Sequence, residues 1–382
     1  GEASWYNSAL LISAGATGAF LSDNIISFFA FHELALIPTF VMIGLYGRGD
    51  RRTTAWRATL YLGLASMVLL AALLMIGTQA GFTFSGLKDF MASGRELAHA
   101  ELIGALLIAG FGTLISLFPF HSWAAPAYAS APAPVAMMHA GVLKKFGLYG
   151  LFMFQPLMET GFLPWTNILL VLLVCNVIWV GYVTVNQKRL DLLLGNSSVM
   201  HMGYIFLAFA ALVVSGSAEA NPWALKGAAL LMLAHGLTIA LLFLLCGQIE
   251  KQTGTLEINS LGGLSTRLPR MAFVFGLAGM ASIGLPGLAN FPGEFMVFFS
   301  GFAGFSNGFG PVQIATILCL WGLVIGAVYM LRAYRNIFQG DLSKASAYAT
   351  GLQPSERAAN CFLVIALAVF GFFPTLVLQF FS

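Results

Sequence analysis

Long apolar runs constrain this chain more than any other feature of its sequence. A membrane-spanning α-helix needs roughly 20 apolar residues, and eleven stretches are about that long or longer. They are 6–22, 24–46, 55–78, 101–129, 133–155, 164–185, 190–214, 224–249, 270–305, 312–336 and 359–380. Only 9% of the 382 residues are charged, against roughly a quarter in a soluble domain. We therefore predict an all-α polytopic membrane protein with about 11 transmembrane helices.

The fourth and ninth runs are too long for one straight helix and contain helix-breaking residues. The fourth contains Pro119 and Pro126, and the ninth contains Gly284, Pro286 and Gly287. Proline removes a backbone donor and glycine loosens a helix, so both runs should form broken helices within the membrane.

The two predicted breaks lie five spans apart, which indicates an internal repeat. An odd number of crossings in each repeat gives the two copies opposite orientations, as in many transporters. We predict a first inverted repeat over 1–155 and a second over 156–337. A linker and a C-terminal transmembrane helix would follow over 338–382.

Basic residues lie mostly on one side of this topology. Opposite them, only Lys88 and Arg95 lie in a loop, and Lys226 lies just inside the eighth run. Cytoplasmic loops carry the excess of Lys and Arg, so the basic side should face the cytoplasm, with the protein integral to a bacterial inner membrane or an equivalent energy-converting membrane. The basic positions are Arg48, Arg51, Arg52, Arg57, Lys188, Arg189, Lys251, Arg267, Arg270, Arg332, Arg335, Lys344 and Arg357.

Composition also argues against several functions. A net charge of +3 gives no support for nucleic-acid binding. The four cysteines stand singly in apolar runs, so we expect neither a disulfide framework nor a metal site. The sequence has no Gly-x-Gly-x-x-Gly after a strand and no cysteine ligand cluster, which predicts no cofactor or redox centre in this chain.

A few ionisable residues remain near the centres of the predicted spans. A charge there costs several kcal/mol unless it is paired or hydrated, so these residues are functional candidates. Burial destabilises the charged form of a side chain, so in general it raises the pKa of Glu and lowers that of Lys, both toward neutral pH. Histidine titrates near neutral pH without burial. The candidates for a proton path are Glu33, Lys145, His201, His235 and Glu294, with His121, His139 and Lys144 as accessories.

Structural roles compete with these functional ones. His32 is assigned to a structural class, and buried ion pairs are the alternative for Glu33, Lys145 and Glu294. Lys144 and Lys145 are consecutive, so they project about 100° apart on a helix and should have different roles.

Several segments resemble the proton-translocating antiporter-like subunits of complex I (NADH:quinone oxidoreductase), of membrane-bound hydrogenases and of Mrp-type cation/proton antiporters. The signature is FPFHSW at 118–123 followed by APAPVAMMHAGVLKKFGLYG at 131–150. HELALIP at 32–38 agrees with it. The resemblance is strongest to subunit M, the mitochondrial subunit 4 type, at SSVMHMG (197–203), AHGLTIALLFLLCGQ (234–248) and NFPGEFM (290–296).

This resemblance implies a role for each candidate. Glu33 corresponds to the entry-channel glutamate and Lys145 to the central lysine of the family. His201 and His235 correspond to the connecting histidines, and Glu294 to the terminal residue toward the exit. His139 matches a histidine of the Mrp-like and distal subunits. The family has fourteen helices, and the chain matches the fourth to the fourteenth.

One position departs from the family pattern. The resemblance implies a lysine paired with Glu33, seven residues before His121, but the chain has Leu114 there. Either Glu33 is neutral at rest, which we favour, or Lys144, His121 or His139 takes the place of the partner.

The resemblance predicts a proton-conducting subunit of a redox-driven NADH:quinone oxidoreductase type of complex, a translocase. Its partners would be other membrane-arm subunits, redox subunits and lipid. A Mrp-type Na⁺/H⁺ antiporter, a membrane-bound hydrogenase subunit and a non-conducting membrane-arm scaffold are the alternatives.

Overall fold

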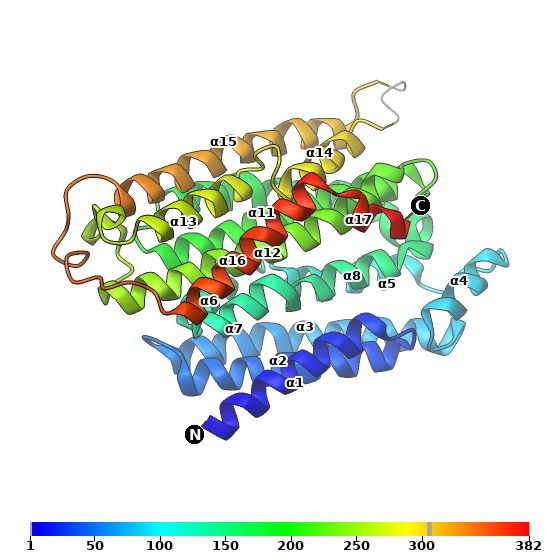
Figure 1. Ribbon diagram of the computed structural model, residues 1–382. Helices are drawn as coiled ribbons and strands as arrows, with labels where there is room; N and C mark the ends of the chain where they lie inside the picture. The colour runs from blue at the N-terminus through cyan, green and yellow to red at the C-terminus, as the bar shows by residue number, and fades with distance from the viewer. Residues whose placement is uncertain (1, 304–307, 382) are drawn as a thin grey trace.

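The computed structural model describes residues 2–303 and 308–381. Its long helices lie side by side in a bundle, and most of their connections gather at the two ends of the bundle (Figure 1). Seven stretches among the described residues are long and apolar enough to cross a membrane. They are Ile25–Tyr46, Arg51–Ala80, Gln155–Val185, Leu190–Ser215, Pro222–Thr253, Pro311–Phe338 and Pro354–Phe372. The predicted all-α polytopic membrane fold is confirmed at this level.

The helices fall into a first and a second series along the chain. The first comprises α1 (Glu2–Leu21), α2 (Ile25–Tyr46), α3 (Arg51–Ala80), α4 (Phe84–Ala92), α5 (Ala100–Ile115), α6 (Ala124–Ser130), α7 (Ala133–Met138), the π-helix η1 (His139–Leu143) and α8 (Lys145–Met153). Short turns η2 (Gln155–Leu157), η3 (Met158–Phe162) and η4 (Leu163–Trp165) lead to the second series. It comprises α9 (Thr166–Cys175), the π-helix η5 (Asn176–Val180), α10 (Gly181–Val185), α11 (Leu190–Ser215), α12 (Pro222–Thr253), η6 (Ile258–Ser260), η7 (Leu264–Thr266), α13 (Pro269–Ser282), α14 (Asn290–Ser300), α15 (Pro311–Phe338), α16 (Pro354–Phe372), α17 (Thr375–Leu378) and η9 (Gln379–Phe381).

The other four predicted spans fall on α1 and on three sets of shorter helices. The run at 101–129 is divided between α5 and α6, and the run at 270–305 between α13 and α14. Both predicted breaks are therefore confirmed. Two further runs contain π-helices: η1 joins α7 to α8 in the run at 133–155, and η5 joins α9 to α10 in the run at 164–185. The sequence analysis predicted neither of these irregularities.

Local sequence explains where several of these helices begin. Asn24 precedes α2, and its Oδ1 accepts hydrogen bonds from the N–H groups of Ile26 and Ser27, which otherwise lack partners in the first turn. Helices α12, α15 and α16 begin with proline, which needs no hydrogen-bond partner at that position.

Helix α11 forms the centre of the molecule, and α16 lies at its periphery. In the most apolar stretch of α11, 94% of the residues are buried, against 11% in α16. Helix α11 packs on α12, α6, α14 and α15. Polar side chains on α11 are therefore enclosed by protein, whereas much of α16 faces outward.

The two ends of the helix bundle differ in charge. The N-terminal end of α1 lies at one end of the bundle in Figure 1, and α4 and the C-terminus lie at the other. The connections that carry Arg48, Lys188 and Arg267 gather at the first end, which we call the basic end. Lys88 and Arg95 lie at the α4 end.

Candidate functional site

His201 and His235 lie together in the protein interior, on α11 and α12. Their rings stack with centroids 5.2 Å apart and planes 28° from parallel. Both residues are buried, and Nε2 of His235 lies 3.3 Å from the hydroxyl of Ser198. Two imidazoles in contact offer neighbouring positions that a single proton can occupy in turn.

Each ring nitrogen of His201 faces a backbone carbonyl oxygen. Nδ1 lies 2.8 Å from the carbonyl of Ser197, one turn earlier on α11, and Nε2 lies 2.9 Å from the carbonyl of Ser282. Ser282 is the last residue of α13. A histidine in the central helix thus contacts the point where the ninth predicted span breaks.

Glu294 enters the same break from α14. Its side chain is buried, and its Oε2 lies so close to Gly284 that a Cβ at that position would collide with it. Gly284 has φ of +80°, which glycine adopts readily. Oε1 has no hydrogen-bond partner among the described residues. The break between α13 and α14 therefore holds two of the predicted path residues.

Lys145 follows a short π-helix, where the helical hydrogen-bond pattern shifts. The backbone N–H of Lys144 bonds to the carbonyl of His139, five residues earlier. The ammonium group of Lys145 donates a hydrogen bond of 2.6 Å to the carbonyl of Ala140. π-Helical turns are often found at functional sites, and this one supplies a backbone acceptor for a buried lysine.

Two glycines bring this π-helix against α12. A Cβ on Gly236 would lie 2.7 Å from the carbonyl oxygen of Gly141, and a Cβ on Gly141 would lie 3.1 Å from that of Gly236. Gly236 directly follows His235. This glycine contact therefore joins α12, which carries His235, to the π-helix that leads into Lys145.

Glu33 is paired, although the sequence analysis favoured an unpaired carboxyl. Ser66 Oγ on α3 donates a hydrogen bond of 2.5 Å to Glu33 Oε1, and Nδ1 of His32 lies 3.2 Å from the same oxygen. The Glu33 side chain is 28% exposed. The sequence analysis assigned His32 a structural role. Because His32 contacts Glu33, we now count it among the candidates for the path. A protonated His32 would form an ion pair with Glu33 in the absence of a lysine at Leu114.

Aromatic packing connects Glu33 to the other buried path candidates, the row formed by Lys145, His235, His201 and Glu294. The ring of His32 packs edge-on against Phe146, with centroids 5.9 Å apart, and Phe146 follows Lys145 in the chain. The ring contact of His32 with Phe146 therefore joins the chain neighbours of Glu33 and Lys145.

Lys144 and His139 form a separate buried group. The ammonium of Lys144 lies 5.3 Å from the centre of the Tyr128 ring and has no hydrogen-bond partner among the described residues. The ring of His139 packs against Trp123 at 5.5 Å and Tyr128 at 5.2 Å. Lys144 and Lys145 thus have different neighbours, and the prediction that they have different roles remains a prediction.

His121 lies in the first break, apart from the row. Its ring stacks on Phe118 with centroids 5.4 Å apart. Its Nδ1 is buried without a hydrogen-bond partner among the residues described.

Residues 22–323 match the family model described as NADH:quinone oxidoreductase/Mrp antiporter, TM. The chain belongs to this antiporter family. It is 35% identical over 380 residues to NAD(P)H-quinone oxidoreductase chain 4 1 of Synechococcus elongatus, covering 97% of this chain and 68% of the relative. It is 30% identical over 376 residues to NADH-quinone oxidoreductase subunit M of Rickettsia felis, covering 97% of this chain and 73% of that one.

Solved structures of antiporter-family proteins share the fold. A chain of respiratory complex I from Thermus thermophilus superposes with a TM-score of 0.87 at 27% identity, covering 98% of this chain and 76% of that chain. A chain of the Mrp complex from Dietzia superposes with a TM-score of 0.82 at 20% identity, with the same two coverages. The second likeness concerns the fold alone.

Leu114 differs from the pattern that the sequence resemblance implied for this antiporter family. It is 3% exposed and belongs to the apolar core near the end of α5. A lysine there would bury an ammonium among apolar side chains.

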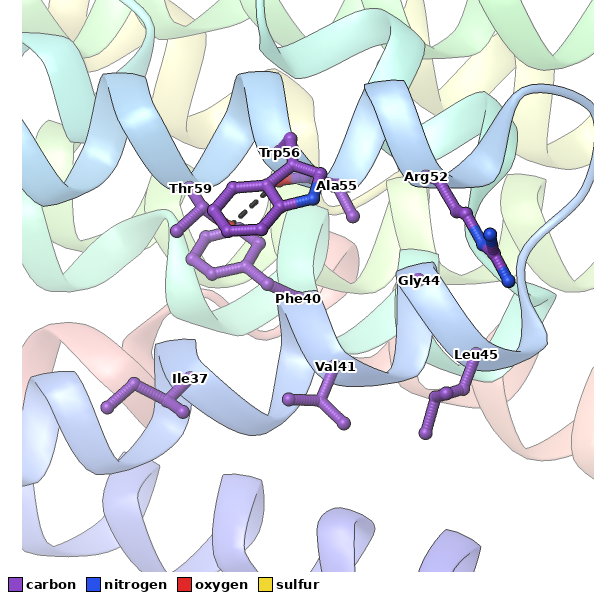
Figure 2. A pocket seen from close by; sticks show the side chains of 9 residues that line it. All are labelled: Ile37, Phe40, Val41, Gly44, Leu45, Arg52, Ala55, Trp56 and Thr59. Carbon is purple, nitrogen blue, oxygen red and sulfur yellow. Dashed lines mark hydrogen bonds between the residues drawn. The ribbon is translucent and has the colours of Figure 1, made fainter.

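A groove on the outer side of the helices is distinct from the buried row. It lies between α2 and α3, where Figure 2 shows Arg52 at one end and apolar side chains along it. Trp56 and Ile37 in this groove are 68% and 59% exposed. Exposed apolar side chains of this size suit contact with lipid tails rather than water.

Sequence reasoning missed the groups that hold the candidates in place. Ser66, Ser198 and the carbonyl of Ser282 gave no signal, because each belongs to a helix distant in sequence from its partner. The Gly141–Gly236 contact could have been suspected, since each glycine lies close in sequence to a candidate residue.

Proposed function

We propose that this antiporter-family chain is a proton-conducting membrane subunit of a redox-driven respiratory complex of the NADH:quinone oxidoreductase type. The names of its relatives in Synechococcus and Rickettsia support the type of complex. Electron transfer would take place in partner subunits, and this chain would supply a path for protons. Its basic end would face the cytoplasm, because cytoplasmic loops carry the excess of basic residues.

The observation that carries this proposal is the buried row from Lys145 to Glu294. Lys145 adjoins His235 through the Gly141–Gly236 contact, His235 stacks on His201, and His201 and Glu294 meet at one break. Enclosing so many titratable groups is costly for a structural purpose alone.

The contacts favour a particular order along the path. Protons would enter near Glu33 and pass Lys145, then His235, then His201, and leave by way of Glu294. His235 precedes His201 because it adjoins the π-helix of Lys145, whereas His201 contacts the break that holds Glu294. Movement would proceed by small changes in charge–charge coupling between neighbouring groups. The two inverted five-helix repeats would place the breaks near the middle of the membrane.

Replacing the central lysine tests the proposal. The complete complex is reconstituted in liposomes, and proton uptake per electron is followed with a pH-sensitive dye. We expect Lys145→Ala to abolish most coupled proton uptake. Lys226→Ala, a lysine in the first turns of α12, should leave it unchanged.

Three outcomes would contradict the proposal. Full proton uptake in Lys145→Ala would exclude the central position of Lys145 in the path. Na⁺ flux without a redox substrate would favour an Mrp-type antiporter. Normal coupling after replacing Lys145, His201 and Glu294 in turn would favour a non-conducting scaffold.

A further inference from the structure

His201 has the hydrogen-bonding environment of a cation. A carbonyl oxygen only accepts hydrogen bonds, and a neutral imidazole has a single N–H. Both ring nitrogens of His201 lie within hydrogen-bond distance of carbonyl oxygens, those of Ser197 and Ser282. Only the doubly protonated ring can donate to both. With a neutral ring, one nitrogen lone pair would face a carbonyl lone pair at that distance.

The carbonyl of Ser282 is available to His201 for a reason that the sequence makes plain. In a continuing helix, this oxygen would accept from the N–H four residues later, and that residue is Pro286, which has none. The N–H of Leu285 bonds instead to Met280. The carbonyl of Ser282 thus lies at the C-terminal end of α13, where the helix carries partial negative charge and favours a cation.

The neighbours of His201 limit how many protons this part of the interior can hold. His235 on α12 stacks on His201. Tyr204, which lies on α11 like His201, packs edge-on against it. Lys145 and Lys144 also lie within electrostatic range, and when charged they oppose a positive charge on His201. Two stacked imidazolium rings would repel each other, so His235 is neutral when His201 is charged.

Two more titratable groups lie close to His201. The hydroxyl of Tyr329 on α15 lies 2.7 Å from the Oγ of Ser197, the residue whose carbonyl faces Nδ1. The carboxyl of Glu294 lies against Gly284, two residues after Ser282. Glu294 is the group that could accept a proton on the far side of the break.

We propose that His201 holds the resting proton of the path and, as an imidazolium, caps the C-terminal end of α13, so that its proton occupancy controls the break between α13 and α14. This inference rests on the proposed function, because it names the group that stores the transferred proton. On release, the proton on Nε2 moves to the carboxylate of Glu294, directly or through water. The product is a neutral His201 that keeps its Nδ1–H bond to Ser197, and a protonated Glu294. The bond to Ser282 is then lost, and the break loosens until His235, first protonated by Lys145, passes that proton to His201.

Hydrogen–deuterium exchange of the intact complex tests this coupling. The peptide over 280–292 reports on the second break. The peptide over 112–124 reports on the first, where the carbonyls of Thr113 and Ser116 accept from Trp123 and Asn176 rather than from a histidine. His201→Asn removes the cation, whereas His201→Lys keeps a cation that can donate to both carbonyls. We expect exchange in 280–292 to be about tenfold or more faster in His201→Asn than in His201→Lys at pH 6, because hydrogen bonds from charged donors are the stronger ones. The peptide over 112–124 should not change.

The wild-type complex provides a second measurement if either variant fails to assemble. The ratio of exchange rates, 280–292 over 112–124, should rise as pH increases through the titration of His201. Equal exchange in the two variants, or a ratio independent of pH between 5 and 9, would overturn the inference. Suppose that Lys145→Ala loses proton uptake, but exchange in 280–292 responds neither to pH nor to the His201 variants. The proposed function would then stand, and only the role of His201 as a cap would be rejected.

Discussion

The two broken helices leave similar backbone groups without helical partners and satisfy them differently. At the first break, the indole N–H of Trp123 donates to the carbonyl of Thr113, and the amide of Asn176 donates to the carbonyl of Ser116. At the second break, His201 contacts the carbonyl of Ser282. The first set of donors does not titrate in the physiological range, whereas imidazole does. The comparison teaches that one kind of break can be fixed or proton-sensitive according to a single capping side chain.

Asn176 satisfies backbone groups at the first break with a side chain that does not titrate. Its amide also donates to the carbonyl of Val199 on α11, and its Oδ1 accepts from the N–H of Phe118. One side chain therefore connects η5, the break and the central helix. No titratable group takes part in these bonds.

The largest expected effect comes from removing that connection. Asn176→Leu leaves buried backbone groups at Ser116, Phe118 and Val199 without this partner. Unsatisfied buried groups cost about 1–3 kcal/mol each, so we expect thermal unfolding of the complex to occur at a markedly lower temperature, by the same amount at pH 6 and pH 8. Asn186→Ala is the matched control, because Asn186 is exposed and bonds only within its own helical turn. A pH-dependent loss in Asn176→Leu would remove the contrast between the breaks.

A smaller effect is expected from Lys144, the buried lysine near the first break. Its ammonium has no hydrogen-bond partner among the described residues, so Lys144→Met should stabilise the complex by about 1–2 kcal/mol by removing a buried polar group. If Lys144 assists proton transfer, uptake per electron should fall severalfold despite this gain. Thermal unfolding and dye-detected proton uptake measure the two effects separately.

Leu143→Met is the control for Lys144→Met, because Leu143 is the equally buried residue that ends the π-helix before Lys144, and it carries no amine. Unchanged proton uptake in Lys144→Met would assign Lys144 to packing against Tyr128 alone. The first half of the chain would then contribute only Glu33, His32 and Lys145 as titratable groups of the path.

The smallest effect is expected at the basic end, away from both breaks. Lys251 at the end of α12 donates a hydrogen bond of 2.8 Å to Glu356 at the start of α16, which holds the pKa of that carboxyl below its usual range. The resulting stabilisation is present above the pKa of the unfolded chain, about 4.3, and is lost as pH falls through the lower folded value. Exposed pairs contribute about 0–1 kcal/mol.

Lys251→Ala should therefore lower the unfolding temperature slightly at pH 7 and hardly at all near pH 3. Comparing unfolding at these two values measures the contribution of the pair. An equal loss at both values would show that Lys251 acts through packing rather than through its charge. The difference between the two pH values would also show how large a pH effect one exposed ion pair produces, for comparison with the second break.

Much of this fold could be predicted from local sequence. Pro119 and Pro126 indicated the first break, and Gly284 and Pro286 the second, because their backbones cannot continue a regular helix. The π-helix at His139–Leu143 could not be predicted in this way, since its residues are compatible with an ordinary α-helix. It depends on packing of Gly141 against α12.

The candidate residues were identifiable from sequence, but their partners were not. Glu33 stood out because a carboxyl in an apolar run is costly, yet Ser66 and His32 as its contacts became clear only when α2 and α3 were placed side by side. Leu114 suggested a missing charge, and the structure places His32 beside Glu33. The sequence alternatives were an unpaired Glu33 or replacement of the partner by Lys144, His121 or His139, and they left out His32, the adjacent residue in the chain.

The sequence by itself determined that this chain occupies a membrane, where its helices break, and which side chains are costly to bury. Each of these follows from the chemistry of one residue or of one contiguous run. Only the tertiary structure decided that the carbonyl of Ser282 meets His201, 81 positions earlier in the chain. Proline frees that carbonyl locally, but the donor that satisfies it comes from another helix. The physical reason is that a buried hydrogen bond requires two groups to be placed together, and helix packing alone places them.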